Sequence, residues 1–227
     1  MAKPKGLKEQ GFDVAQDAKP EDTKAVSIEI AQPPFLIQGR PIARLTIERM
    51  TFSQFSRVCR MADAAAVFNK AENNNKFFLR EKLKMQLRFH AVDGTIIVPT
   101  DDAILQLPRQ YAVTVTRATE QTADPIGELL SDGDGIGSPV LYRLGTPIKT
   151  STGDISELEF TARTLGDIED VLAADRRTDQ VLELIRTCAK PIGAQEGLLA
   201  LPSWGAEQIT LTDGLILMDQ VLPRFLD

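Results

Sequence analysis

Cysteine and histidine, on which many metal and redox sites depend, are scarce in this 227-residue chain. Its two cysteines, Cys59 and Cys188, make no disulfide framework, and neither lies at metal-ligand spacing from the single histidine, His90. We therefore predict that both cysteines are free thiols and that the protein is located in a reducing compartment. A catalytic base needs a nucleophile and an orienting acid, and no serine is usefully placed near His90 in the sequence, so we expect a half-exposed strand residue rather than a catalytic base.

Long apolar runs are also missing. No stretch of about eighteen apolar residues occurs, which argues against a membrane-spanning helix. The basic residues 1–8 are not followed by an apolar segment, so we expect no signal peptide there. Aromatic residues make up only 6% of the chain, and any core must be built mainly from Leu, Ile, Val and Ala.

Basic residues are outnumbered by acidic ones. The 26 Lys and Arg against 32 Asp and Glu give a formal net charge of -6. Nucleic-acid binding needs concentrated positive charge, so this balance argues against it. One local cluster, Arg80, Lys82, Lys84 and Arg88, alternates with apolar residues. We interpret it as a solvated face, with an RNA or anion contact as the less favoured alternative.

A glycine-rich run at 133–137 invites comparison with phosphate and calcium loops. Asp132 and Asp134 would repel phosphate, and a predicted strand follows instead of a helix. As a calcium loop beginning at Asp132, the run would need a bidentate Glu at its twelfth position, which is Arg143. Both interpretations fail, so the run is predicted to belong to a linker.

Paired carboxylates give no better case for catalysis. Glu157 with Glu159, and Glu169 with Asp170, fall on predicted exposed faces of a strand and a helix, with no polar pocket to hold them. The sequence therefore offers no catalytic residue, no metal ligands and no cofactor motif. We expect a non-enzymatic protein.

Composition divides the chain into four segments. Residues 1–24 are polar and charged, which predicts a disordered tail. Residues 122–138 contain four glycines, three aspartates and a proline, which predicts a linker with a short helical turn at 126–130. Residues 25–121 and 139–227 are predicted to be two modules, the first carrying an inserted hairpin.

The two modules share an apolar pattern. An ungapped offset of 113 residues places Ile28 on Leu141, Leu45 on Leu158 and Phe52 on Leu165. Leu107-Pro108 resembles Leu201-Pro202 at an offset of 94, so the first module has 19 extra residues, which we place within 69–100. The alternative is that any strand pair followed by an amphipathic helix produces much of this pattern.

Each module is predicted to be a β-hairpin followed by short helices, so the fold class is α+β. The predicted strand pairs are 27–31 with 43–49 and 140–144 with 155–161. The inserted hairpin spans 87–98 and turns at Asp93-Gly94. Helices are predicted over 51–68, from Thr164, from Thr178 or Asp179, and from Thr212 or Asp213.

Several short motifs in residues 141–226 occur in a recognisable order. They are Leu144-Gly145-Thr146-Pro147-Ile148, a turn at Gly153, Leu158 and Phe160 leading to Arg163, Pro191-Ile192, Leu201-Pro202, and Ile209-Thr210-Leu211-Thr212-Asp213 before an apolar helix ending at 221–226. This order resembles the tail assembly chaperones of contractile-tailed phages. The chain departs from that family in carrying the unit twice and in the added hairpin of the first copy.

The resemblance implies a role in the host cytoplasm, where the protein would keep the tape measure protein soluble and help recruit tail tube subunits. The candidate contact residues lie on the last helix and the Leu-Pro turn, although for each of them a place in the core is the favoured alternative. They are Trp204, Leu215, Met218, Leu222 and Phe225. The competing hypothesis is a structural subunit of the tail or baseplate that remains in the finished particle.

Overall fold

The computed structural model describes residues 25–31, 34–121, 124–150, 153–192, 201 and 203–226. Antiparallel sheets and helices alternate in blocks along the chain, so the predicted α+β class is confirmed. The predicted N-terminal tail, 1–24, lies outside the described residues. No helix in the described ranges is both long and apolar enough to cross a membrane.

The first sheet is built from the first half of the chain, in the order β1-β3-β4-β5 with β2 also paired to β3. Residues alternate between a buried and an accessible face, most clearly in β4. The strands are β1 Val26–Glu29, β2 Leu36–Ile37, β3 Arg40–Ile47, β4 Leu87–Ala91 and β5 Ile96–Ile97. The helices of this half are α1 Phe52–Phe68, α2 Asn75–Gln86, α3 Asp101–Leu105 and α4 Arg109–Gln121.

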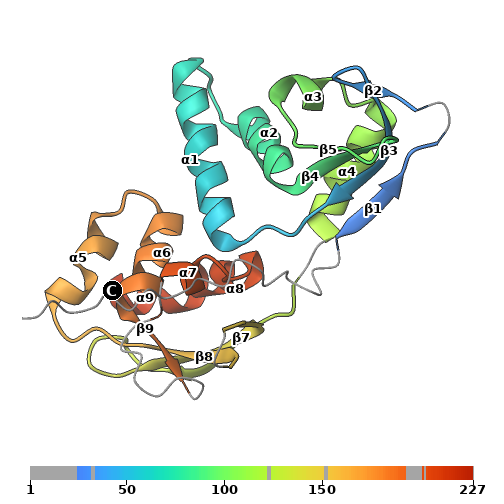
Figure 1. Ribbon diagram of the computed structural model, residues 1–227. Helices are drawn as coiled ribbons and strands as arrows, with labels where there is room; N and C mark the ends of the chain where they lie inside the picture. The colour runs from blue at the N-terminus through green and yellow to red at the C-terminus, as the bar shows by residue number, and fades with distance from the viewer. Residues whose placement is uncertain are drawn as a thin grey trace, which may run out of the picture.

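The second sheet has the order β6-β7-β8-β9 and lies apart from the first (Figure 1). Its helices pack on the side that faces the first half, so that α6 and α8 lie near α1. The strands are β6 Glu128–Asp132, β7 Val140–Ile148, β8 Ile155–Phe160 and β9 Ala189–Ile192. The helical segments are α5 Leu165–Ala173, α6 Arg177–Cys188, α7 Ser203–Ala206, α8 Leu211–Ile216, the π-helix η1 Leu217–Val221 and α9 Pro223–Leu226.

Both predicted strand pairs and the inserted hairpin are confirmed. β1 pairs with β3, β7 pairs with β8, and β4 turns into β5 at Asp93-Gly94. Thr51 and Thr164 are N-caps of α1 and α5, each within a capping box. The last helix begins earlier than predicted, because Thr210 caps α8 by accepting a hydrogen bond from the amide of Asp213.

The predicted linker is not irregular throughout. The helical turn predicted at 126–130 is wrong, because Glu128–Asp132 forms β6, an edge strand hydrogen-bonded to β7. The glycine-rich run after it is a defined turn, in which the Asp134 carboxylate accepts hydrogen bonds from the amides of Ile136 and Ser138. Composition could not show that β7 would leave a free edge for this segment to pair with.

The order strand, strand, helix, helix, strand occurs in each half, as β1-β3-α1-α2-β4 and β7-β8-α5-α6-β9. The offset of 113 holds for the caps Thr51 and Thr164. It is wrong for the first strands, because Ile28 lies opposite Leu45 whereas Tyr142, not Leu141, lies opposite Leu158.

The extra residues of the first half do not all lie within 69–100, as predicted. Helix α1 has 17 residues where α5 has 9, whereas α2 and α6 both have 12. The second half of α1 is therefore part of the extension.

Two large apolar clusters form the interior. One holds the buried side chains of the first sheet with α3 and α4, and the other holds those of the second sheet and its helices. Phe52, the first residue of α1, belongs to the second cluster although it follows a strand of the first sheet. Helix α1 therefore joins the two halves of the molecule.

Candidate protein-interaction surface on α1

The N-terminal half of α1 is anchored on the second half of the chain. The amide of Phe52 donates a hydrogen bond to the carbonyl of Ile209 at 3.0 Å, and Thr51 and Thr210 form an isolated antiparallel β-bridge. Helix α8 can approach because Gly214 lacks a side chain; a Cβ there would lie 2.0 Å from Cγ of Phe52. Phe55 adds a partly buried ring to the same cluster. This half of the helix is therefore held rigidly.

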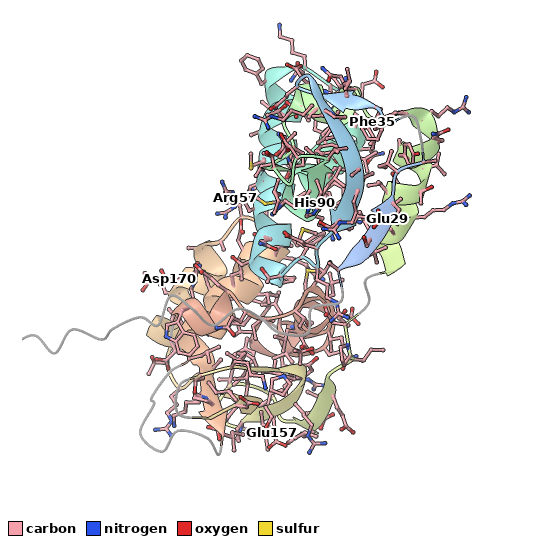
Figure 2. All side chains as sticks on the ribbon, turned by 45° about the vertical axis from the view of Figure 1, so that its right-hand side comes forward. Glu29, Phe35, Arg57, His90, Glu157 and Asp170 are labelled. Atoms are coloured by element: carbon pink, nitrogen blue, oxygen red, sulfur yellow. The ribbon has the colours of Figure 1, made fainter. Side chains whose placement is uncertain are left out.

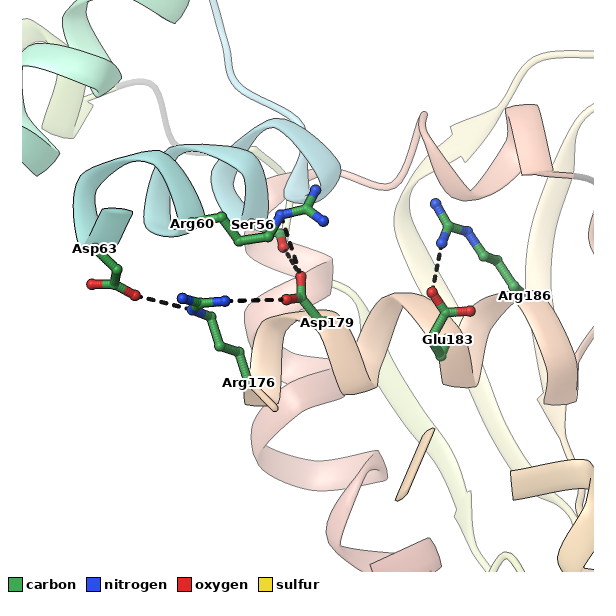
Figure 3. A network of polar contacts seen from close by, with 7 residues as sticks. All are labelled: Ser56, Arg60, Asp63, Arg176, Asp179, Glu183 and Arg186. Carbon is green, nitrogen blue, oxygen red and sulfur yellow. Dashed lines mark hydrogen bonds and ion pairs between the residues drawn. The ribbon is translucent and has the colours of Figure 1, made fainter. Parts of the chain in front are cut away.

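A polar network fastens α1 to the start of α6 (Figure 3). The buried Ser56 hydroxyl donates to the Asp179 carboxylate. Arg176, the N-cap residue of α6, donates from Nε to Asp63 at 3.0 Å and lies 3.9 Å from Asp179. Charged groups of both signs alternate across the contact, so the two helices are tied by charge as well as by packing.

A second polar cluster lies where the two halves meet and is deeply buried. Asp213 is fully buried and accepts hydrogen bonds from the Tyr142 hydroxyl at 2.9 Å and the Gly145 amide at 3.0 Å. Burial, together with the Asp213 carboxylate, raises the pKa of Tyr142. Nearby, Arg49 pairs with Asp124, whose pKa is raised chiefly by burial. Most of these groups satisfy one another, although Nε of Arg49 is buried with no hydrogen-bond partner in the described part of the chain. The arrangement indicates a structural joint rather than an open site.

The C-terminal half of α1 has much less to pack against. Its small cluster has only three buried members among the described residues, Ala62 and Ala66 of α1 and Phe77 of α2. In Figure 1 this end of α1 rises away from α6 and α8 with α2 on one side. So thin a core contributes little stability of its own.

A face of α1 that runs into this half is open to solvent and is apolar after its first residue, Arg57. Arg57, Met61, Ala64 and Phe68 are exposed and follow one another at spacings of four, three and four residues. These spacings place them on one side of the helix, in the pattern of a coiled-coil seam. Figure 2 shows Arg57 directed outward from α1. We call these four residues the α1 stripe.

The apolar part of the α1 stripe is more exposed than a core helix allows. Phe68 is 87% exposed, and Val67 beside it is 79% exposed. Met61 also belongs to the exposed class. Because large apolar side chains gathered at one place on a surface mark interaction sites, the α1 stripe with Val67 is the best-formed candidate in the described chain.

The five contact residues predicted from the sequence differ in their exposure to solvent in the structure. Trp204 on α7 is 42% exposed and Leu215 on α8 is 38% exposed, so both remain candidates. Leu222 and Phe225 are wrong as surface residues, because both are buried in the second core; Met218 is partly buried against it.

A π-helix lies between the exposed and the buried residues of this set. In a continuous α-helix Leu215, Met218, Leu222 and Phe225 would share one face. The wider turn of η1, Leu217–Val221, rotates the residues that follow it relative to those before it. Leu222 and Phe225, which follow η1, are buried in the core, whereas Leu215, which precedes it, is 38% exposed.

The residues that the sequence raised as possible catalytic or anion-binding groups make contacts within the fold. His90 is a partly buried residue of β4 whose Nε2 lies 2.8 Å from the Thr46 hydroxyl, and burial, with Arg44 nearby, lowers its pKa. Glu157 on β8 pairs with Arg143, on the part of the second sheet labelled in Figure 2. Lys84 and Arg88 pair with carboxylates.

Other possible sites are weaker. No group of three or more His, Cys, Asp or Glu that could hold a metal ion occurs in the described ranges. A shallow depression beside α9 is lined by Leu129, Asp134, Asp219, Gln220, Pro223 and Arg224. Two of its polar groups are engaged, since Asp134 accepts from its own turn and Arg224 donates to the Asp132 carbonyl.

The sequence contained a signal for the α1 stripe that was not used. The spacing of Met61, Ala64 and Phe68 is visible in the sequence, but so is the spacing of Phe55, Ala62 and Ala66 on the opposite side. Both faces are apolar, and only the packing of α2 shows which one is covered.

Comparison with known proteins does not assign this chain to a family. No protein-family model matches the chain, and no curated protein or solved structure matches it. The resemblance to phage tail assembly chaperones therefore depends on the short motifs quoted above.

Proposed function

We propose that this protein is a tail assembly chaperone that binds amphipathic helices of a phage tape measure protein and keeps them soluble. The observation that carries the proposal is the α1 stripe with Val67, an apolar helix face with coiled-coil spacing that is open to solvent. A tape measure helix presents apolar stripes of its own, which aggregate when left uncovered. Two such faces can pack as knobs into holes.

The size of this surface suits a chaperone that must release its guest. Met61, Ala64, Val67 and Phe68 span only about two helical turns, too little for a permanent complex. Trp204 and Leu215 offer a second exposed apolar area on α7 and α8. Two weak surfaces on one chain raise the effective concentration for a repetitive guest without making either contact slow to release. Recruitment of tail tube subunits belongs to the same proposal.

The test is co-expression with a tape measure fragment that precipitates when expressed alone. The native chain is expected to keep the fragment soluble and to co-purify with it. The double substitution Met61→Asp with Phe68→Asp places two charges in the α1 stripe, so we expect at least a tenfold loss of soluble fragment. The matched control is Leu165→Asp, which charges an exposed leucine on α5 that is 70% exposed, between the values for Met61 and Phe68, and it should retain the effect.

Two results would count against the proposal. One is equal solubilisation of the fragment by the native chain and by the double variant. The other is the presence of this protein in purified, finished particles, which is what the competing structural-subunit hypothesis expects. A chaperone that leaves after assembly is absent from the particle.

A further inference from the structure

A lysine at the end of α1 occupies a conformation that usually belongs to glycine. Lys70 has φ of 51°, and its amide donates to the Val67 carbonyl at 3.1 Å. The next amide, of Ala71, donates to the Ala66 carbonyl at 2.9 Å. Together these bonds make a Schellman motif, in which glycine is preferred at the Lys70 position because a side chain is strained there. Lys70 is one of two described non-glycine residues with a positive φ, the other being Gln38.

Lys70 is one of three cations of this segment that lie on or beside the α1 stripe. Arg57 is its first residue and Arg60 follows three positions later on α1. Arg57 and Lys70 are exposed, and no carboxylate lies within ion-pair distance of either in the described part of the chain. Their charges are therefore available to a partner.

Few acidic groups offset this charge. Between Arg57 and Lys76 the acidic residues are Asp63 and Glu72. Asp63 is already paired with Arg176 at 3.0 Å and accepts a hydrogen bond from Asn74, whereas Glu72 is exposed. Arg60 lies 3.9 Å from Asp179 but keeps a side chain that is 53% exposed. The segment that carries the α1 stripe therefore has more basic than acidic residues, on a chain whose net charge is -6.

We infer that the α1 stripe selects amphipathic helices whose apolar stripe is flanked by Asp or Glu. This inference rests on the proposed function and specifies the chemistry of the guest. A helix packed on Met61, Ala64 and Phe68 brings its flanking residues close to the surrounding cations. Carboxylates there gain attraction, and lysines are repelled. The overall acidity of the chain predicts the opposite preference, so only this local surface favours an acidic guest.

Two synthetic helical peptides test the inference. They share one heptad stripe of leucines and differ only in the residues beside it, which are Glu in one peptide and Lys in the other. With the full chain at low salt, we expect the Glu peptide to bind about tenfold more tightly, a preference that shrinks in about 0.5 M salt.

Substitution of Lys70 separates charge from folding. Lys70→Gly removes the charge and relieves the strained backbone, so the unfolding midpoint should stay the same or rise while the Glu peptide binds about threefold more weakly. Arg57→Gln should weaken binding similarly. The matched control is Arg117→Gln, at an exposed arginine of α4, which should leave binding unchanged.

The outcomes distinguish the two proposals. Equal binding of both peptides, or tighter binding of the Lys peptide, overturns the acidic preference and leaves helix binding by the α1 stripe in place. Binding of neither peptide overturns the α1 stripe as a helix-binding site, and with it the surface on which the proposed function depends. A Lys70→Gly variant that binds the Glu peptide as tightly as the native chain also overturns the inference.

Discussion

Asp213 is the residue on which most buried polar contacts of the joint converge. Its carboxylate accepts from Tyr142 and Gly145 and from the hydroxyl of Thr210, the cap of α8. Close packing surrounds it, because a Cβ on Gly127 would lie 2.3 Å from its Oδ1. The Thr-x-x-Asp sequence at 210–213 therefore both caps α8 and supplies the buried acceptor for Tyr142 and Gly145.

We predict that Asp213→Ala lowers the free energy of unfolding by about 3 kcal/mol, because it leaves buried donors without an acceptor. Asp213→Asn keeps one acceptor oxygen and should cost less. Urea unfolding of both variants measures the difference. Asp170→Ala, at an exposed position of α5 labelled in Figure 2, is the control and should stay within about 0.5 kcal/mol of the native chain. An equally small loss in Asp213→Ala would show that the joint is not important for stability.

At the scale of single elements, α5 is a helix whose start depends on one carboxylate. Asp167 accepts hydrogen bonds from the amides of Arg163 and Thr164, both at 2.8 Å. These bonds lower the pKa of Asp167 below its ordinary value of 3.8. Because the folded pKa is the lower one, the stabilisation is complete above the ordinary pKa and is lost as the pH falls through the lowered value.

We therefore predict a pH-dependent effect of Asp167→Asn. The native chain should have a higher melting temperature than the variant by a constant amount above about pH 5, and the difference should shrink as the pH falls below 3.8. Thermal unfolding followed by circular dichroism across this range measures it. A difference that persists unchanged at the lowest pH would mean that the carboxylate charge is not what caps α5.

The elements also show how far sequence reasoning reached. The cap Thr164, the helix over 51–68 and the Asp93-Gly94 turn were predicted because each depends on residues close together in the chain. Strand β6 and the π-helix η1 were missed, since β6 needs the free edge of β7 and η1 alters a periodicity that looked continuous. The sequence also left open which face of α1 is covered, because that depends on where α2 packs.

For the whole molecule, α1 is the element that couples the two halves. Phe52 inserts into the core of the second half, and the network of Ser56, Arg176 and Asp179 follows along the same contact. The two cores should therefore unfold as one cooperative unit. Trp204, the single tryptophan, reports on the second half alone, whereas circular dichroism reports on both.

We predict that fluorescence and circular dichroism give coincident unfolding curves for the native chain. Phe52→Ala removes the ring that joins the cores and should cost about 3–5 kcal/mol. The fluorescence transition should then move to lower denaturant and separate from the curve measured by circular dichroism. Leu165→Ala, at an exposed residue, serves as the control and should leave both curves in place. Coincident curves in Phe52→Ala would contradict a coupling role for this ring.

The sequence by itself determined the α+β class, the paired strands, the helix cap at Thr164 and the inserted hairpin, because alternation, capping and turn chemistry act between residues close in the chain. Only the tertiary structure decided which apolar faces remain open. Burial of a side chain depends on what distant segments place against it, so α2 covers Ala62 and Ala66 but leaves Phe68 exposed, and the second core encloses Leu222 and Phe225.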